Sequence, residues 1–162
     1  MAENYSRVEK DRYGGNRYLD GNGYLHRTDG PAWEKHYGGW EWHYHGMFHR
    51  IGGPAAYFPD HEEHNHHPIY EWWHENVVHR LDGPALIYAD GRSIWVIDGL
   101  YFDANRDPRL GPELIKWATQ HRIKFPLDEE QLIQFRLTWA DEIDEIAWGR
   151  KIMRRLRERR AF

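Results

Sequence analysis

Cysteine is absent from this chain, and its absence excludes disulfide bonds and every zinc site that needs thiolate ligands. The sequence also lacks a hydrophobic run long enough to cross a bilayer, and Met1 to Gly15 holds no apolar stretch of signal-peptide length. We therefore expect a cytoplasmic protein with no membrane insertion. A net charge of −4 gives no global attraction to nucleic acid, so the composition does not favour nucleic acid as a partner.

Aromatic residues are what the sequence has in excess, since nine Trp and ten Tyr help to raise the aromatic share to 15%. So many rings must either pack in a core or bind a ligand. Twelve histidines also make the net charge sensitive to pH near the ordinary histidine pKa. A chain of 162 residues has room for one domain with an appendage.

One phrase, His-Arg followed by Gly-Pro-Ala, occurs three times along the chain. Its histidines are separated by 23 and then by 30 residues, and they are His26, His49 and His79. The longer interval contains DHEEHNHH (Asp60 to His67), which we interpret as a loop inserted into a period of 23. Periods of this length indicate an array of supersecondary units, each of which buries its apolar face against a neighbour.

Each unit has the pattern of a β-hairpin, because the segments WEWHY, YEWWH and SIWVI are short, aromatic and β-branched. A large apolar residue lies seven positions ahead of each histidine and of Phe102, which takes the histidine position in a shortened last unit: Leu19, Trp42, Trp72 and Trp95. Four residues further on, each unit has Gly or Asn: Gly23, Gly46, Asn76 and Gly99. Gly and Asn tolerate positive φ, so these positions predict tight turns, as Gly38 and Gly91 do elsewhere in their units.

Alternation along the strands predicts which side chains form the core. Trp40, Trp42 and Tyr44 share one side with their counterparts in later units: Tyr70, Trp72, Trp95 and Ile97. Glu41, His43 and His45 lie on the other side, as do Glu71 and Glu75. We expect the aromatic set to be buried and the Glu and His set to be exposed.

The phrase itself has a structural interpretation. Gly30, Gly53 and Gly83 are able to adopt backbone angles closed to other residues, and the following proline fixes φ and removes a donor, so a strand should end or bend there. Arginine and aspartate two residues apart are placed to pair in two copies, whereas Gly52 replaces the acid in the middle copy. A catalytic site normally assembles once from different residue types, so a triplicate His-Arg favours a structural role, with a repeated ligand-binding groove as the alternative.

The 23-residue period, the aromatic strand, the turn Gly and the HRxDGPA phrase resemble MORN-type repeats, in a variant form that we associate with phage and bacterial proteins. The resemblance covers about residues 17–102, with Asp-Gly-Pro-Ala or Gly-Gly-Pro-Ala in place of the usual Gly-x-Gly. It implies a sheet of successive hairpins that acts as a protein-interaction or lipid-associated module. One form of this expectation is a phage protein that engages a host protein.

The period of 23 disappears after Phe102, and residues 103–111 predict a linker. Pro112 is suited to the first position of a helix that runs to about His121.

Asp128 and Gln131 predict the N-cap and capping box of a second helix. Its apolar residues advance by three or four positions past Gly149, which predicts one long amphipathic helix: Leu132, Phe135, Trp139, Ile143, Ile146, Met153 and Leu156. Its acidic residues come first and its arginines last. We interpret it as a solvated helix whose apolar stripe packs on the end of the sheet. The alternative uses the arginine-rich end to bind phosphate, nucleotide, nucleic acid or an acidic partner.

The inserted loop contains His61, His64, His66 and His67 together with three carboxylates, which are suitable ligands for Zn²⁺ or Ni²⁺. A polar loop tip in solvent is the favoured interpretation. The alternative is a His-dependent metal enzyme, a hydrolase or a nuclease, with zinc as its cofactor. Otherwise no cofactor is expected.

The sequence thus predicts an α+β fold. Residues 1–16 form an N-terminal segment, 17–102 an elongated antiparallel sheet of MORN-like hairpins, 103–111 a linker, and 112–162 a helical part that caps the sheet. The predicted function is non-catalytic binding of a protein partner. The candidate binding residues are His26, Arg27, His49, Arg50, Trp73, His79, Arg80, Arg154, Arg155 and Arg157. Whether the sheet edges pair to form a homodimer stays open.

Overall fold

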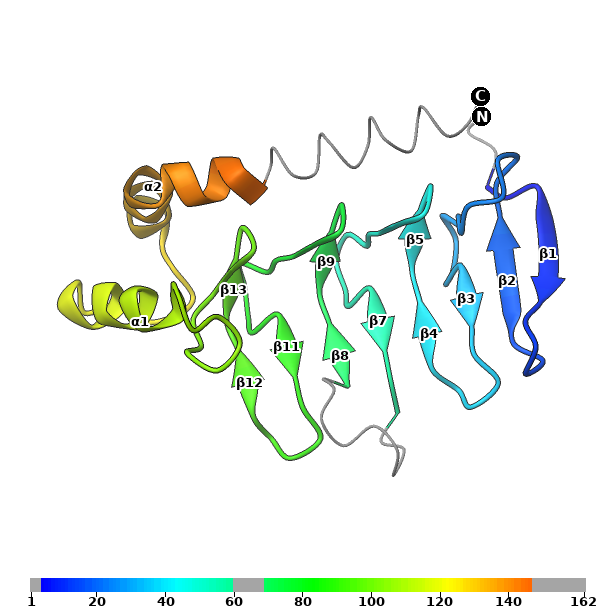
Figure 1. The fold of residues 1–162 in the computed structure, drawn as a ribbon, viewed down its shortest axis with the longest axis horizontal. Coiled ribbons are helices and arrows are strands. Elements are labelled where there is room, and N and C mark those ends of the chain that lie inside the picture. Colours follow the sequence, from blue (N-terminus) through cyan, green and yellow to red (C-terminus); the bar gives the residue numbers. More distant parts are fainter. Residues whose placement is uncertain (1–3, 60–68, 147–162) are drawn as a thin grey trace. The chain divides into compact units, whose positions relative to one another are not determined.

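The computed structural model describes residues 4–59 and 69–146, which fold into a large antiparallel sheet of short strands and a set of helices (Figure 1). The predicted α+β class, with a sheet made of hairpins, is confirmed. The chain divides into two compact units, which are described separately below. Unit 1 comprises Met1–His79 and Ala85–Ser93, and unit 2 comprises Arg80–Pro84 and Ile94–Phe162.

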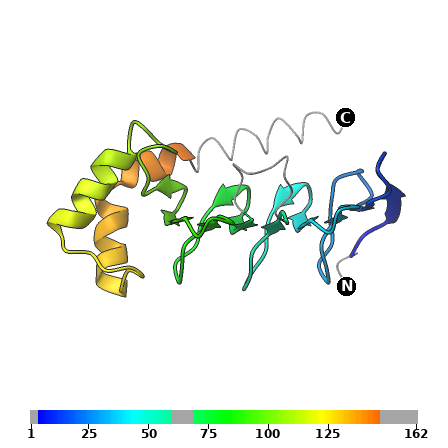
Figure 2. The ribbon, with the colours of Figure 1, turned by 90° about the horizontal axis from the view of Figure 1, so that it is seen from below.

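In the described residues the large sheet has eight strands, which neighbour one another in sequence order (Figures 1 and 2). They are β1 (Arg7–Lys10), β2 (Asn16–Leu19), β3 (Trp33–Glu34), β4 (Trp40–Glu41), β7 (Ala56–Tyr57), β8 (Tyr70–Glu71), β11 (Leu86–Ile87) and β12 (Ser93–Ile94). Strand β1 pairs with β2 along its length, so the sheet begins ahead of the repeated units.

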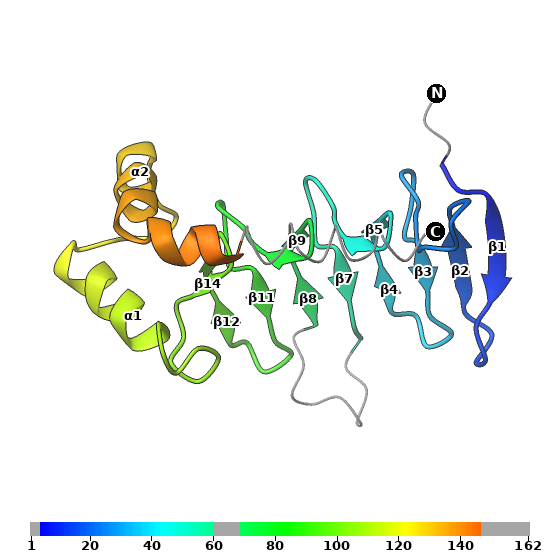
Figure 3. The same cartoon turned by 45° about the horizontal axis from the view of Figure 1, so that its top comes forward.

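Three small hairpins accompany this sheet in the same described residues. They are β5 (His43–Tyr44) with β6 (Met47–Phe48), β9 (Trp73–His74) with β10 (Val77–Val78), and β13 (Val96–Ile97) with β14 (Leu100–Tyr101). Strand β5 follows β4 after one residue, and β9 follows β8 in the same way (Figures 1 and 3). Each repeat therefore contributes two strand pairs that are joined at a bend.

The residue at the bend holds both strand pairs through its backbone. The Trp42 N–H donates to the Ala55 carbonyl at 2.6 Å, and the Trp42 carbonyl accepts from the His49 N–H at 3.2 Å. The same two hydrogen bonds recur at Trp72 with Ala85 and His79, and at Tyr18 with Ala32 and His26.

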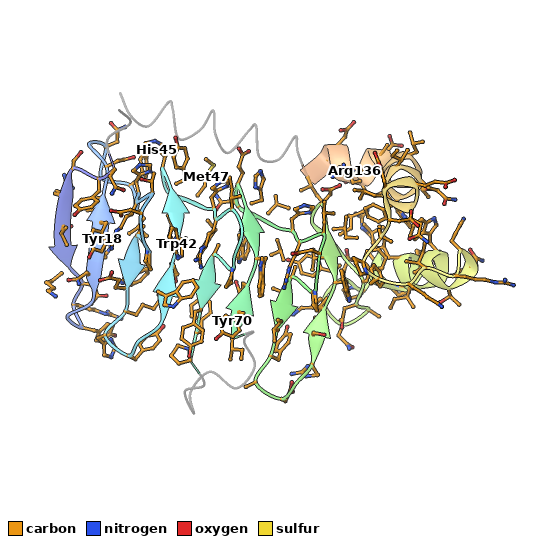
Figure 4. All side chains as sticks on the ribbon, turned by 180° about the vertical axis from the view of Figure 1, so that it is seen from behind. Tyr18, Trp42, His45, Met47, Tyr70 and Arg136 are labelled. Atoms are coloured by element: carbon orange, nitrogen blue, oxygen red, sulfur yellow. The ribbon has the colours of Figure 1, made fainter. Side chains whose placement is uncertain are left out.

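Tyr18, and not Leu19, is therefore the counterpart of Trp42, which corrects the predicted alignment of the first unit. Tyr18 and Trp42 lie at the same level of neighbouring hairpins (Figure 4). The reason is a longer turn, since the Asp20 N–H donates to the Tyr24 carbonyl at 2.8 Å across three residues. The later hairpins close through only two turn residues.

The predicted turns are confirmed. Gly23, Gly46, Asn76 and Gly99 all have positive φ, between 64° and 84°. In the three later hairpins the preceding residue also has positive φ, as in a type I′ turn: His45, Glu75 and Asp98. Residue type at these positions therefore sets the hairpin register.

The prediction of which side is buried is wrong for the middle of the sheet. Glu41 and His43 are 7% and 5% exposed, whereas Tyr44 is 43% exposed and Trp40 and Trp42 are half-buried. Alternation was predicted correctly, but it does not say which side faces inward.

The Glu41 carboxylate tolerates burial because its charge is paired. Lys35 Nζ lies 2.8 Å from one of its oxygens, and His43 Nε2 lies 2.9 Å from the other. Lys35 Nζ also lies 3.4 Å from the centroid of the Trp33 ring, and Trp33 and Ala56 flank Glu41 across the strands. Lys35 lies in the connection between β3 and β4, outside the motif WEWHY, so that motif alone does not reveal the pairing.

In unit 2 the helices pack on the hairpin β13–β14. Helix α1 covers Gly111–Gln120, helix α2 covers Glu129–Thr138, and a further helical segment covers residues 140–146. The core of unit 2 contains Ile97 and Leu100 from the hairpin, Leu114 and Trp117 from α1, and Phe135 from α2. Ile97 is therefore a core residue, as predicted.

The predicted helix starts are confirmed, but the single long helix is wrong. Asp128 accepts a hydrogen bond from the Gln131 N–H at 2.8 Å, and the reciprocal bond of the capping box is also present. Helix α2 ends at Thr138, where Trp139 (φ −112°, ψ 28°) leaves the helical conformation. The half-buried Trp139 packs against the same core as the two helical segments that flank it. The break in the helix therefore accompanies the packing of Trp139 against this core.

We expect Phe135→Ala to destabilise unit 2 by about 3–5 kcal/mol, because it removes a side chain that is 0% exposed at the centre of that core. Urea unfolding followed by Trp fluorescence measures the change. Leu137→Ala is the matched control on the same helix, since Leu137 is 75% exposed and should change stability by less than about 0.5 kcal/mol. Equal effects of the two substitutions would contradict this packing.

The paired Glu41 predicts a loss of stability in acid. Burial acts to raise its pKa, but the hydrogen bonds from His43 and Lys35 prevail, so the pKa of Glu41 lies below its ordinary value of 4.5. A carboxyl whose pKa is lower in the folded state stabilises the fold above its unfolded pKa, and this stabilisation is lost as the pH falls through the folded pKa.

The free energy of unfolding of Glu41→Gln should therefore fall short of the wild type at pH 7, and the gap should shrink as the pH is lowered below about 4.5. Lys35→Met should remove part of the same pH dependence. Denaturant titrations at a series of pH values provide the measurement, and a gap that is constant with pH would show that Glu41 is not charged in the fold.

Candidate functional site

The histidines of the repeated phrase bind the turn of the following unit. His26 Nδ1 accepts the His45 N–H at 3.1 Å, and His49 Nδ1 accepts the Glu75 N–H at 3.4 Å. The His26 ring is 1% exposed and stacks on His45 with 4.0 Å between centroids. These imidazoles therefore act on different turns and do not converge on one reacting group.

Burial lowers the pKa of His49, and the nearby charge of His74 lowers it further. The neutral form, which has a free acceptor nitrogen, is the one that this hydrogen bond requires. The third histidine, His79, donates its backbone N–H to the Trp72 carbonyl.

The arginines of the phrase fold back over the loop that follows them. Arg27 Nε donates to Asp29 at 2.7 Å, and Arg80 Nε donates to Asp82 at 2.7 Å, so both predicted Arg–Asp pairs are confirmed. A second guanidinium nitrogen of each arginine donates to the carbonyl of the phrase's proline, at 3.4 Å for Arg27, 3.0 Å for Arg50 and 3.1 Å for Arg80.

The glycines of the phrase provide space, which corrects the prediction that they provide unusual backbone angles. Gly30, Gly53 and Gly83 are not among the residues with positive φ. A Cβ on them would lie 2.6, 3.0 and 2.6 Å from Cζ of the arginine three residues earlier. A side chain in place of the glycine would therefore crowd the guanidinium and displace it.

An aromatic ring covers the other side of the guanidinium. Arg27 Cζ lies 4.1 Å from the centroid of Tyr18, and Arg50 Cζ lies 4.3 Å from the centroid of Trp42. A cation that lies over an aromatic face at this distance is attracted to the ring. We call this arrangement of ring, guanidinium and glycine the arginine stack.

A row of half-buried rings continues from the stack of the middle unit across the sheet. Trp40 lies opposite Tyr57, and Tyr57 lies opposite Tyr70, with ring centroids 5.7 and 4.9 Å apart. Trp42 and Trp72 belong to this side as well, since Arg50 lies over the rings of both Trp40 and Trp42, and the ring centroids of Tyr70 and Trp72 are 6.4 Å apart. We call these five aromatic residues the aromatic face. The tryptophan-rich motifs predicted these aromatic residues on one side of the sheet. They are half-buried, whereas the sequence analysis expected full burial.

Trp73, a predicted binding residue, also has contacts within the fold. The Trp73 side chain is half-buried, its Nε1 donates to Glu71 at 2.7 Å, and its ring stacks on Phe48 at 5.2 Å. The other candidates, Arg154, Arg155, Arg157 and the metal ligands His61, His64, His66 and His67, lie outside the described residues.

Among residues 4–59 and 69–146 no cluster of three or more His, Asp or Glu is arranged to hold a metal ion. The helices in this part of the chain are too short or too polar to span a membrane. Comparison of the chain with protein-family models, with curated proteins and with solved structures finds no match.

The arginine stack can be tested by a double-mutant cycle. Gly30→Ala should destabilise the protein because its Cβ displaces the Arg27 guanidinium from Tyr18 and Asp29. In the Arg27→Ala background the same substitution should cost less, with a coupling energy of about 0.5–3 kcal/mol. Gly21→Ala is the control, because the nearest atom to its Cβ is Ser6 Oγ at 3.7 Å. A Gly30 effect that is independent of Arg27 would mean that the glycine acts through the backbone alone.

Proposed function

We propose that this chain is a non-catalytic protein-interaction module built from MORN-like repeats. The observation that carries the proposal is the aromatic face, where Trp and Tyr rings lie half-exposed beside the Arg50 guanidinium. Trp, Tyr and Arg are the residue types that most often dominate the energy of protein interfaces. A row of rigid rings on a sheet also loses little conformational entropy on binding.

The contacts of the repeated histidines and arginines favour a binding function over a catalytic one. His26 and His49 hold turns, and the arginines hold the loops of their own units. Catalysis needs different groups at one point, whereas these groups act at successive points along the repeats. The metal-enzyme alternative gains no support from the described histidines for the same reason.

The resemblance of the phrase to MORN-type repeats of phage and bacterial proteins supports the setting that we propose, in which a phage protein engages a host protein in the cytoplasm. The partner surface should be apolar where it covers the rings.

Site-specific crosslinking tests this function. Replacing Tyr57 with a photoreactive benzoyl-phenylalanine should yield a discrete protein adduct in bacterial extract, because Tyr57 lies in the middle of the aromatic face. The same amino acid at Tyr13, which is 59% exposed on the turn between β1 and β2, should not yield that adduct.

With the purified partner, Trp40→Ala should weaken binding about 10-fold or more, the effect of losing an interface hot spot. Identical adducts from both positions, or recovery of nucleic acid alone, would contradict the proposal. Thermal unfolding of the Trp40→Ala variant establishes that the fold survives.

A further inference from the structure

The arginines of the three phrases differ in the carboxylates that they contact, and the difference leaves one donor edge of Arg50 without the acceptor found in the other two. Arg27 and Arg80 each donate Nε to an aspartate two residues on. Arg27 also contacts a second carboxylate, with Nη1 3.0 Å from Glu34. In the middle unit Gly52 stands at that position, and Arg50 forms no ion pair with any residue of the described ranges 4–59 and 69–146. The middle stack has the ring, the glycine and the proline carbonyl in place, but its backbone differs at Gly52, whose φ is +78°.

Without this aspartate, no carboxylate in the described residues offsets the desolvation of the Arg50 guanidinium. Burial acts to lower the pKa of Arg27, but its hydrogen bond to Asp29 and the neighbouring negative charge reverse that effect. Burial lowers the pKa of Arg50. A half-buried guanidinium with an unfilled donor edge gains more from an incoming anion than a fully hydrated one.

The surroundings of Arg50 define the shape of the site. The Trp42 ring and Gly53 both lie against the guanidinium, and one nitrogen is engaged by the Pro54 carbonyl. The edge at Nε, which donates to an aspartate in the phrases of Arg27 and Arg80, has no carboxylate partner in the described residues. Gly52 places no side chain there, and the neighbouring Ile51 is 82% exposed.

We propose that the Nε edge of Arg50 binds the carboxylate of an Asp or Glu side chain supplied by the protein partner, which takes the place of the missing aspartate of the repeat. An apolar residue next to that acid in the partner contacts Ile51. A planar carboxylate matches a single guanidinium edge, whereas phosphate sites usually gather several cations or backbone donors. This inference rests on the proposed protein-binding function and names the group that the site recognises.

Substitution at Gly52 gives a matched pair of variants. Gly52→Asp supplies an acid from the chain itself, so it should occupy Arg50 and exclude the partner carboxylate. Gly52→Asn places a side chain of similar size at the same positive φ of +78°, so it introduces a similar backbone strain. It adds no charge, so binding should persist. Arg50→Gln should abolish binding in either background.

The probe is a short peptide, acetyl-Leu-Asp-Leu-amide, titrated into the full chain while the Arg50 Nε–H signal is followed by NMR. We expect a saturable shift in the wild type and in Gly52→Asn, at least about 10-fold weaker affinity in Gly52→Asp, and no shift with the Asn analogue of the peptide. An unchanged Arg50 signal, equal behaviour of Gly52→Asp and Gly52→Asn, or an equal response to inorganic phosphate would overturn the inference.

The same variants separate this inference from the proposed function. If the partner crosslinked at Tyr57 binds Gly52→Asp as well as it binds the wild type, protein binding stands and the carboxylate site fails. If the peptide shifts Arg50 but Tyr57 yields no protein adduct, the carboxylate site stands and the proposed function fails.

Discussion

The structure of each repeat depends on one residue at a bend, whose backbone N–H and carbonyl serve two different strand pairs. Tyr18, Trp42 and Trp72 occupy this position, and each receives a hydrogen bond from the backbone of the phrase's histidine. The ring of the same residue supports the phrase's arginine in the two units where the contact is shown, at Tyr18 and Trp42. Backbone direction and side-chain stacking are thereby fixed at one point, and a side chain in place of the phrase's glycine would crowd the guanidinium.

The two sides of the sheet differ in how far their polar groups are buried. On the inner side, Glu41 is buried and is paired with Lys35 and His43, which makes its charge tolerable but inaccessible. On the other side, rings and guanidiniums remain half-exposed, and the middle stack lacks the carboxylate that completes the other two. For this reason the proposed binding surface is the aromatic face, and not the histidines of the repeated phrase.

Much of the fold could be predicted because residue type encodes it locally. Positive φ restricts the turn positions to Gly23, Gly46, Asn76 and Gly99, and the capping box of Asp128 lies within four consecutive residues. What failed depends on contacts that residue type within a strand does not reveal. Alternation groups Glu41 with His43, but the ion pair with Lys35, from the connection between β3 and β4, makes the burial of that side tolerable. Likewise, the break at Trp139 comes from packing against the core of unit 2, and the need for Gly30 comes from where Arg27 folds.

Hydrogen bonds link each of the later hairpins in unit 1 to its predecessor, and they run in both directions. The Gly46 N–H donates to the Leu25 carbonyl, the Asn76 N–H donates to the Phe48 carbonyl, and Asn76 Oδ1 accepts from the Phe48 N–H. During synthesis from the N-terminus, the hairpin that each new one docks against has already been made. Such an arrangement allows the repeats to fold one after another in the order in which they are synthesised.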